Sequence, residues 1–300
     1  MRDPCVPLPA GYQSRPATPA DLPALHRLVA ACEQDLLGRA VTAPGFPGPE
    51  PRSGTVLVCA PDGSPAGWGR LDARRATVHV HPGHRGRGLG RALLDWSELC
   101  ARRYGADRLS QSVPDGDTAA AVLLRSRGYV PFVTEWLLEI GLPAGPEVPQ
   151  APAGITVRPF RPGDEQAAYR LAEDAFDDWQ RHRTAYPEWA RRTVESAAFA
   201  PAASPVALAG DEMVGVVLSS DPPGGAEGYV ERVAVRHDHR GRGIARVLLR
   251  HAFRTFHRQG RSACALWTHT DTGALALYER VGMTVRHSST VHGKALAPAR

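Results

Sequence analysis

The residues with the clearest chemical use lie in the segment Gly228–Ala245, which reads GYVERVAVRHDHRGRGIA. Its first half alternates and is rich in valine, like a half-buried strand, and apolar residues recur at helical spacing after the polar turn Arg236–Arg242. The first amides of a helix lack internal partners and carry the positive end of the helix dipole. Glycine at 241 and 243 removes side chains that would keep an anion away from them. The segment therefore predicts a strand, a pyrophosphate-binding loop and a helix.

The spacing of this loop separates it from two other phosphate-binding loops. A dinucleotide fingerprint would need a third glycine at position 246, which is Arg246, and the Gly-Lys-Ser/Thr of nucleoside triphosphatases is absent from the sequence. The run from Arg240 to Ala245 instead fits Arg/Gln-x-x-Gly-x-Gly/Ala after a valine-rich strand. It resembles the coenzyme A loop of the Gcn5-related N-acetyltransferases, the GNAT family. An ordinary glycine turn is the plainer alternative for the loop taken alone.

The same pattern occurs a second time upstream. The aligned segments of the first and second copies are Ala76–Leu94 with Glu231–Leu249, Asp117–Tyr129 with Asp271–Met283, and Arg15-Pro16 with Arg158-Pro159. Gly88 thus matches Gly243, at an offset of 155 residues. The chain is therefore interpreted as a tandem duplication.

Length and composition agree with two domains. Three hundred residues allow two domains of about 150 residues, each large enough to bury a core. The segment 141–154, GLPAGPEVPQAPAG, is rich in proline and glycine, which is typical of a linker. We predict a first domain at 1–142, a linker at 143–154 and a second domain at 155–300. The family resemblance implies an α/β (α+β) fold, with a mixed, mostly antiparallel sheet flanked by helices in each copy.

Local patterns predict the elements of both copies. The first copy should contain a strand at Gly11–Ala17, a helix at Thr18–Leu37, a loop at Gly38–Ser53, a hairpin of Thr55–Ala60 and Pro65–Leu71, a strand at Ala76–His81, a helix at Gly88–Tyr104, a strand at Arg108–Ser112, a helix at Thr118–Ser126 and a strand at Tyr129–Ile140. The second should contain a strand at Ile155–Phe160, a helix at Asp164–Phe176, a hairpin of Pro205–Ala209 and Glu212–Ser219, a strand at Tyr229–Val235, a helix at Arg242–Gln259, a strand at Ala263–Thr268, a helix at Thr272–Val281 and a strand at Thr284–His292.

Acetyl transfer to an amine needs two proton-handling groups, and the second copy offers both. The amine must lose a proton before or during its attack on a thioester, so a carboxylate beside the cofactor is useful. The departing thiolate must be stabilised or protonated, which suits a tyrosine hydroxyl. Glu231 lies in an otherwise apolar strand, and burial there would raise its pKa. Tyr278 lies in a segment similar to the Ala-x-x-Leu-Tyr-x-x-x-Gly-Phe of the family, where the hydroxyl reaches the sulfur.

The resemblance also implies which residues contact acetyl-CoA. The strand would pair with the pantetheine arm and the loop amides would bind the pyrophosphate. In the second copy these residues are Val233, Ala234, Val235, Arg240, Gly241, Arg242, Gly243, Ile244, Ala245, Arg246 and Asp271, where Asp271 replaces the usual asparagine of the family. In the first copy the equivalent residues are Val78, His79, Val80, Arg85, Gly86, Arg87, Gly88, Leu89 and Gly90.

The first copy lacks the acid and the base. Ala76 stands where the second copy has Glu231, and Leu124 stands where it has Tyr278. The first copy is therefore expected either to bind coenzyme A or only to keep the fold, and one active site is expected, in residues 150–300.

The amine acceptor should enter opposite the cofactor, between the loop Phe176–Trp189 and the last strand near His287–His292. Acidic side chains there could attract a cationic amine or simply be solvated, namely Asp174, Asp177, Asp178 and Glu227. Aromatic side chains there could line a pocket or hold the helix on the sheet, namely Trp179, Tyr186 and Trp189.

Composition limits the other function classes. The net charge is +5, almost entirely from arginine since Lys294 is the only lysine, and no long basic run indicates nucleic-acid binding. Five cysteines form no metal-ligand spacing, and the repeat already explains the histidine-bearing loops, so we predict no metal site. No run of eighteen apolar residues indicates a membrane span, and the first residues lack a signal-peptide pattern. We expect a cytoplasmic monomer or homodimer.

The sequence thus predicts an acetyl-CoA-dependent N-acetyltransferase that moves an acetyl group to a primary amine of a small molecule by direct attack on the thioester. Two alternatives remain open. One is an acyl-CoA-binding sensor or scaffold without catalysis, which the presence of Glu231 and Tyr278 disfavours. The other is an N-terminal acetyltransferase of proteins. The identity of the acceptor and the preferred acyl chain are not fixed by any sequence feature.

Overall fold

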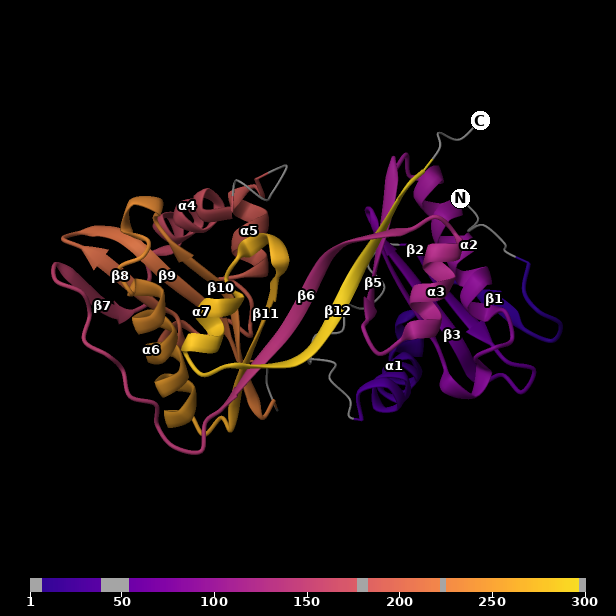
Figure 1. Cartoon of the computed structure of the whole chain (residues 1–300), viewed down its shortest axis with the longest axis horizontal. Helices are drawn as coiled ribbons and strands as arrows, with labels where there is room; N and C mark the ends of the chain where they lie inside the picture. The colour runs from indigo at the N-terminus through magenta and orange to yellow at the C-terminus, as the bar shows by residue number, and fades with distance from the viewer. Residues whose placement is uncertain (1–6, 39–53, 177–182, 222–224, 297–300) are drawn as a thin grey trace. The chain divides into compact units, whose positions relative to one another are not determined.

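The chain folds into two compact units. The computed structural model describes residues 7–38, 54–176, 183–221 and 225–296. The first unit combines Met1–Thr134 with His287–Arg300, and the second is Glu135–Arg286. Figure 1 shows that helices flank a sheet in each unit. The predicted α/β fold, with a mixed sheet flanked by helices in each copy, is therefore confirmed. Residues 39–53 of the predicted loop lie outside the described residues.

The sheet of the first unit has the strand order β1-β2-β3-β4-β5-β12. Its neighbours run antiparallel, except that β4 and β5 are parallel. The strands are β1 (Gln13–Arg15), β2 (Gly54–Cys59), β3 (Pro65–Asp72), β4 (Arg75–Val80), β5 (Arg108–Pro114) and β12 (Thr284–Ala295). The helices are α1 (Leu22–Leu37), α2 (Leu89–Arg103) and α3 (Thr118–Ser126).

Alternation along β2 places a helix on each face of this sheet. Leu57 packs with the apolar side of α1, while Val56 and Val58 pack with α2 on the opposite face. Trp96 of α2 is fully buried in that second layer. The period of two in the strand and the period of 3.6 in the helices therefore build two apolar layers.

The sheet of the second unit has the strand order β6-β11-β10-β9-β8-β7. Again the neighbours are antiparallel, apart from the parallel pair β10 and β11. The strands are β6 (Val130–Gly141), β7 (Ile155–Pro159), β8 (Pro205–Ala209), β9 (Glu212–Ser220), β10 (Glu227–Val235) and β11 (Ala263–His269). The helices are α4 (Glu165–Phe176), α5 (Tyr186–Arg192), α6 (Ile244–Arg258) and α7 (Leu275–Arg280).

The helices of the second unit also cover both faces of its sheet. Val216 of β9 packs in the layer formed with α4 and α5, and the adjacent Val217 packs in the layer formed with α6 and α7. The helix α6 lies very close to β10. A Cβ added at Gly228 of β10 would come within 2.3 Å of the Phe256 ring of α6. Glycine at this position therefore fixes how closely α6 approaches the central strand.

The two copies share a clamp at the start of their first helices. Arg15 donates two hydrogen bonds to Asp21, at 2.7 and 2.6 Å, and Arg158 donates two to Asp164, at 2.7 and 2.8 Å. These hydrogen bonds from arginine are the main reason why the pKa values of both carboxyl groups are lowered. The clamp explains why the Arg-Pro pair recurs in the sequence.

Most predicted elements occur within one to three residues of their expected bounds. The helix α1 begins four residues later than predicted, because Pro19–Asp21 forms a 3-10 turn before it, and α5 was not predicted. A third helix begins three residues late. The helix predicted from Thr272 begins only at Leu275, because Thr270–Thr272 forms a separate 3-10 turn that ends at Gly273 in the left-handed conformation, with φ of 61°. Left-handed glycine is a common way to interrupt a helix.

The last strand of each copy pairs with a strand of the other copy. Glu135–Gly141 of β6 pairs with β11 at seven registered positions, and Ser289–Ala295 of β12 pairs with β5 at seven. The compact units therefore do not coincide with the predicted segments 1–142 and 155–300. Both final strands are antiparallel partners for similar neighbours, so the sequence pattern alone does not decide which sheet each one joins.

The predicted linker is attached to the second unit rather than a free tether. The carbonyl oxygens of Leu142, Pro146 and Ala153 accept hydrogen bonds from side chains of the second copy, at 3.0, 3.1 and 3.2 Å. Their donors are His257, Arg254 and Arg242, respectively. The linker thus runs along α6 and the loop before it.

Replacing a first-copy leucine should destabilise the second unit. Leu138 of β6 is fully buried in the core formed with α6 and α7, so Leu138→Ala should lower the free energy of unfolding by about 2 to 5 kcal/mol. Hydrogen exchange would show faster exchange in β11 and α6 before β2 and β3. Faster exchange confined to the first unit would contradict the strand assignment.

Candidate active site

The central feature of the second unit is the place where two parallel strands separate. The strands β10 and β11 pair only at Glu227–Ala263, Gly228–Cys264 and Tyr229–Ala265, although both strands continue beyond these positions. From Val233 to Val235 the registered partners of β10 all lie on β9. The other backbone edge of these residues faces the gap, so an extended ligand with amide groups could pair with it.

The loop after β10 has the conformation that an anion site needs. Gly241 and Gly243 have φ values of 74° and 86°, and a Cβ at either position would meet open space. Gly243 is the N-cap of α6, and no side chain caps the helix there. The first α6 amide with a helical partner is that of Val247, which donates to the carbonyl oxygen of Gly243. The preceding amides are therefore available to a ligand.

The arginines of this loop hold its backbone in place. The Arg240 side chain donates to the carbonyl oxygens of Val235, at 3.1 Å, and Ala175, at 3.5 Å. Arg242 donates to the carbonyl oxygen of Ala153. In this structure both guanidinium groups stabilise the loop, while no side chain caps the first amides of α6.

A β-bulge positions Glu231. Ser219 and Leu218 of β9 pair with Val230 and Arg232, so that Glu231 is the extra residue between them. Its carboxylate accepts a hydrogen bond of 2.6 Å from the Ser220 hydroxyl. Desolvation raises the pKa of Glu231, and the Ser220 hydrogen bond and the Arg232 charge partly offset the rise. The bulge thus directs a carboxylate with increased proton affinity out of the regular ladder.

Tyr278 extends from α7 into the core beneath the same strands. Only 7% of it is exposed, and its ring packs with the cluster that includes Val230 and Leu266. Burial raises the pKa of Tyr278 to about 12. Its hydroxyl is therefore a proton donor, rather than a base, near neutral pH.

Tyr229, which was not selected from the sequence, occupies the last paired position of β10 and β11, two residues before Glu231. Burial raises the pKa of Tyr229, and the charges of Glu231 and Tyr278 add to the rise, while a hydrogen bond from the Trp267 backbone opposes it. Tyr229 thus lies near Glu231 at the last paired position of β10 and β11, while Tyr278 packs on the other face of the sheet, beside Val230. Tyr229 lies two residues before Glu231 in a strand, and this spacing was the sequence signal that could have identified it.

Asp271 lies at the start of the segment that carries Tyr278. It belongs to the 3-10 turn Thr270–Thr272 and is exposed. The turn is held by Thr272, whose hydroxyl donates to the carbonyl oxygen of His269 at 2.8 Å. Asp271 thus stays at the surface, on the β11 side of the gap.

The first copy repeats the separation of strands and the glycine loop. The strands β4 and β5 pair only at Arg75–Ser110 and Ala76–Gln111, and Gly86 and Gly88 have φ values of 73° and 87°. The loop side chains, however, interact with other protein groups. Arg85 forms an ion pair of 2.5 Å with Asp35, and Arg87 donates to the Tyr12 hydroxyl at 3.2 Å. Pro9 lies beside Gly88.

The positions of the missing acid and base in the first copy are buried and apolar. Ala76 is 1% exposed and Leu124 is 2% exposed. His79 of β4 stacks on Trp68, with 5.7 Å between ring centroids, and burial lowers its pKa to about 4. Neither Val78 nor Val80 beside it can exchange a proton. Among the described residues of this unit, the positions aligned with Glu231 and Tyr278 therefore carry no acid or base.

The acidic and aromatic side chains proposed for the acceptor have different environments. Asp174 pairs with Arg183 at 2.6 Å, and Glu227 accepts two hydrogen bonds from Arg286. Trp189 is 2% exposed and packs against the sheet, whereas Tyr186 is half-buried. Asp177, Asp178 and Trp179 lie outside the described residues. His287–His292 belongs to the first unit, where Ser289 and the residues after it pair with β5.

Searches of the described residues for metal sites and membrane spans gave negative results. No group of three or more His, Cys, Asp or Glu side chains in this part of the chain could hold a metal ion. None of the helices within the described ranges is long and apolar enough to cross a membrane.

Family models match both copies. The model of the "Acetyltransferase (GNAT) family" matches residues 166–283, and the model of the "Acetyltransferase (GNAT) domain" matches residues 52–131. Each match thus contains one of the two glycine loops. The duplication inferred from the sequence coincides with two copies of one known domain.

Curated relatives match over most of the chain. A protein of Geodermatophilus obscurus named mycothiol acetyltransferase is 32% identical over 253 residues, which cover 79% of this chain and 80% of that protein. A protein of the same name from Thermobispora bispora is 30% identical over 287 residues, which cover 89% of this chain and 94% of that protein. The resemblance therefore includes both copies.

Solved structures show the same architecture. A GCN5-related N-acetyltransferase from Sphaerobacter thermophilus superposes with a TM-score of 0.85 at 32% identity and covers 98% of each chain. A tandem GNAT protein of the clavulanic acid pathway shares the fold with a TM-score of 0.75 at 18% identity, over 96% of this chain and all of that one. The chain therefore belongs to the GNAT acetyltransferase family, as a tandem acyltransferase similar to mycothiol synthase.

Proposed function

We propose that the chain transfers an acetyl group from acetyl-CoA to a primary amine of a small molecule, and that the reaction takes place in the second unit. The observation that supports this most directly is that the Glu231 bulge follows the last paired position of β10 and β11, while the buried Tyr278 packs in the core that includes Val230 of the same strand. Only the second copy combines the gap, the uncapped helix and two proton-handling groups among the described residues.

The residues of this unit fit acetyl-CoA. The amides at the start of α6 lack capping side chains, the space beside Gly241 and Gly243 is open, and β10 presents an edge that β11 does not use. An anion would be held by the amides of Gly243 and the next three residues, and a chain of amides would pair with Val233–Val235. When bound, acetyl-CoA supplies the activated acetyl thioester.

Glu231 is proposed to accept the proton of the attacking amine, either directly or through a water molecule. An ammonium group cannot attack, so a base must remove its proton before or during bond formation. The raised pKa of Glu231 brings it closer to the working pH and strengthens it as a base. Ser220 orients the carboxylate through its hydrogen bond.

Tyr278 is proposed to donate a hydrogen bond or a proton to the departing sulfur. Its pKa of about 12 keeps the hydroxyl protonated near neutral pH. Burial also removes competing water, which strengthens a hydrogen bond to developing negative charge. An acyl-CoA sensor would have no need for such a donor opposite a base, so catalysis is favoured over the sensor alternative.

The first test concerns the base. Glu231→Gln should lower kcat/KM by about a hundredfold or more, because one proton-transfer group is lost. The pH profile of the unmodified enzyme should fall toward acid as Glu231 becomes protonated, and this limb should disappear in the variant. Ser220→Ala removes a hydrogen bond that favours the carboxylate, so its acid limb should move to higher pH. An unchanged profile in both variants would exclude Glu231 as the base.

The second test concerns the acid. Tyr278→Phe keeps the buried ring but removes the hydroxyl, and should lower turnover about tenfold to a thousandfold without weakening acetyl-CoA binding. Stopped-flow turnover and calorimetric binding would separate the two effects. Turnover equal to that of the unmodified enzyme would mean that the tyrosine only packs in the core.

The third test asks which loop binds the cofactor. Gly243→Glu and Gly88→Glu introduce the same strain, because φ is 86° at one position and 87° at the other. Titration with acetyl-CoA should show one site in the unmodified protein, lost in Gly243→Glu and kept in Gly88→Glu. The reverse pattern would move the active site to the first copy, and two sites would mean that the first copy also binds the cofactor.

A further inference from the structure

A row of side chains leads from the active site across the face of the second sheet that α4 and α5 cover. Tyr229 pairs with Ser220 of β9, and Ser220 also forms a bridge with Phe199. Directly paired residues of neighbouring strands point to the same face. Phe199 therefore lies on the face that carries the Ser220 hydroxyl and its partner Glu231, two strand spacings, or about 10 Å, from Tyr229.

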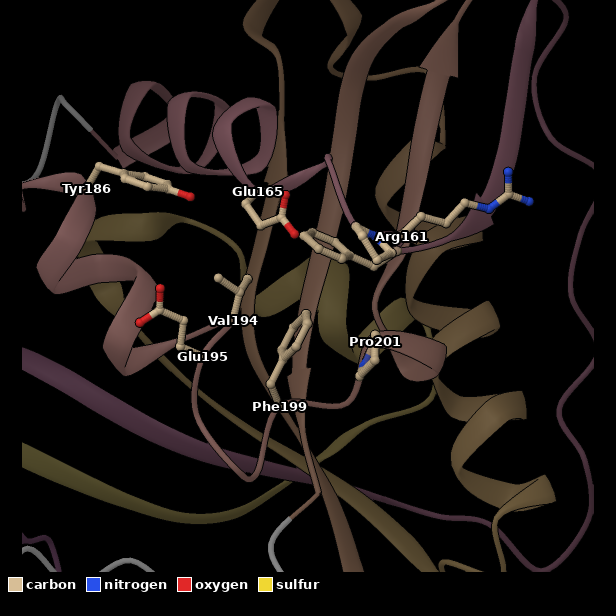
Figure 2. A pocket seen from close by; sticks show the side chains of 9 residues that line it. Arg161, Glu165, Tyr186, Val194, Glu195, Phe199 and Pro201 are labelled. Atoms are coloured by element: carbon tan, nitrogen blue, oxygen red, sulfur yellow. The ribbon is translucent and has the colours of Figure 1, made fainter.

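Phe199 lines a cavity at the end of this row. The cavity has a volume of about 400 Å³, and its lining includes Phe160, Arg161, Glu165, Tyr186, Glu195 and Phe199. These residues come from the end of β7, the start of α4, the start of α5 and the segment before β8. Figure 2 shows them around a common space. None of them takes part in the proposed proton transfers.

The aromatic walls of this cavity are held by other rings. Phe160 and Phe199 meet edge to face, with 5.2 Å between centroids. Tyr186 packs with Tyr169 at 5.4 Å and with Trp189 at 6.0 Å, and the Tyr169 hydroxyl donates to the carbonyl oxygen of Thr184. The cavity therefore has a preformed aromatic surface, which suits a small ligand.

The charges around the cavity favour a cation. Glu165 is half-buried and Glu195 is exposed. One oxygen of Glu165 accepts a hydrogen bond from the Gly163 amide at 2.8 Å, which leaves the other oxygen to a ligand. In Figure 2 the Arg161 side chain extends away from the cavity, while the Glu165 carboxylate points toward the other lining residues. Carboxylates beside aromatic rings are suited to an ammonium group.

We propose that this cavity binds the second cationic group of a diamine or polyamine acceptor, whose first amino group is acetylated beside Glu231. The backbone spacing of about 10 Å from Tyr229 to Phe199 is the basis for choosing an acceptor with about that distance between its two amino groups. This inference rests on the proposed function and assigns a substrate class to the same site.

Calorimetric titration tests the cavity without depending on turnover. The full-length protein with coenzyme A would be titrated with octamethylenediamine and with the matched amino alcohol, in which a hydroxyl group replaces one ammonium group. The diamine should bind about tenfold more tightly, since only it brings a cation to the carboxylates and rings. Equal affinities for the two compounds would overturn the proposal.

A double variant identifies the groups responsible. Glu165→Gln with Glu195→Gln keeps the shape and the Gly163 contact but removes both charges, so the preference for the diamine should disappear. Glu188→Gln is the matched control, because Glu188 lies on α5, pairs with Arg192 and does not line the cavity. A preference that survives in the double variant, or is lost in the control, would contradict the proposal.

Turnover of the same compounds distinguishes this inference from the proposed function. Acetylation of both compounds with equal kcat/KM would support the transferase and overturn the cavity assignment. Tight, charge-dependent binding of the diamine without any acetylation would keep the cation site but overturn the assignment of a diamine as the acceptor.

Discussion

The separation of β10 from β11 after Tyr229 is the constraint on which the active site depends. Two parallel strands that stop pairing leave backbone groups unsatisfied, which is costly unless a ligand or water satisfies them. The gap can persist because each strand is paired on its other side, β10 with β9 from Tyr229 onward apart from the bulge at Glu231, and β11 along its whole length with Glu135–Gly141 of β6. The contact between Gly228 and Phe256 then places the start of α6 beside the gap. The strand supplied by the first copy is therefore part of the frame that holds the gap between β10 and β11 open.

The two similar glycine loops have different surroundings. In the first copy Asp35 and Tyr12 interact with Arg85 and Arg87, so these side chains already have partners within the protein. In the second copy the arginines bind backbone carbonyl oxygens instead, while the first amides of the helix lack a capping side chain in both copies. The first copy contributes its last strand to the second unit. Selection for that strand could maintain the first copy even without catalysis of its own.

The sequence was sufficient to predict most elements, because strand alternation, helical periodicity and glycine loops are local signals. The mixed sheets and the tandem GNAT fold were likewise predicted correctly. The exchange of final strands was not, since β6 and β12 present similar antiparallel edges and only the long-range register decides between partners. The bulge at Glu231 and the proximity of Tyr229 also depend on pairing between strands. The cavity near Phe199 joins segments that no single motif connects.

The raised proton affinity of Glu231 serves the proposed reaction, but it also lowers the stability of the folded protein once the carboxyl group ionises. Its pKa is raised in the folded protein, so the folded state binds this proton more tightly than the unfolded chain does. The linked stability is present at low pH and decreases as the pH rises and the carboxyl group ionises. The Ser220 hydrogen bond reduces this loss of stability. Removing the loss entirely would need a charge partner, which would also lower the pKa of Glu231. A base with a raised pKa is therefore a destabilising group, and the strand pairing on the outer sides of the gap compensates for it.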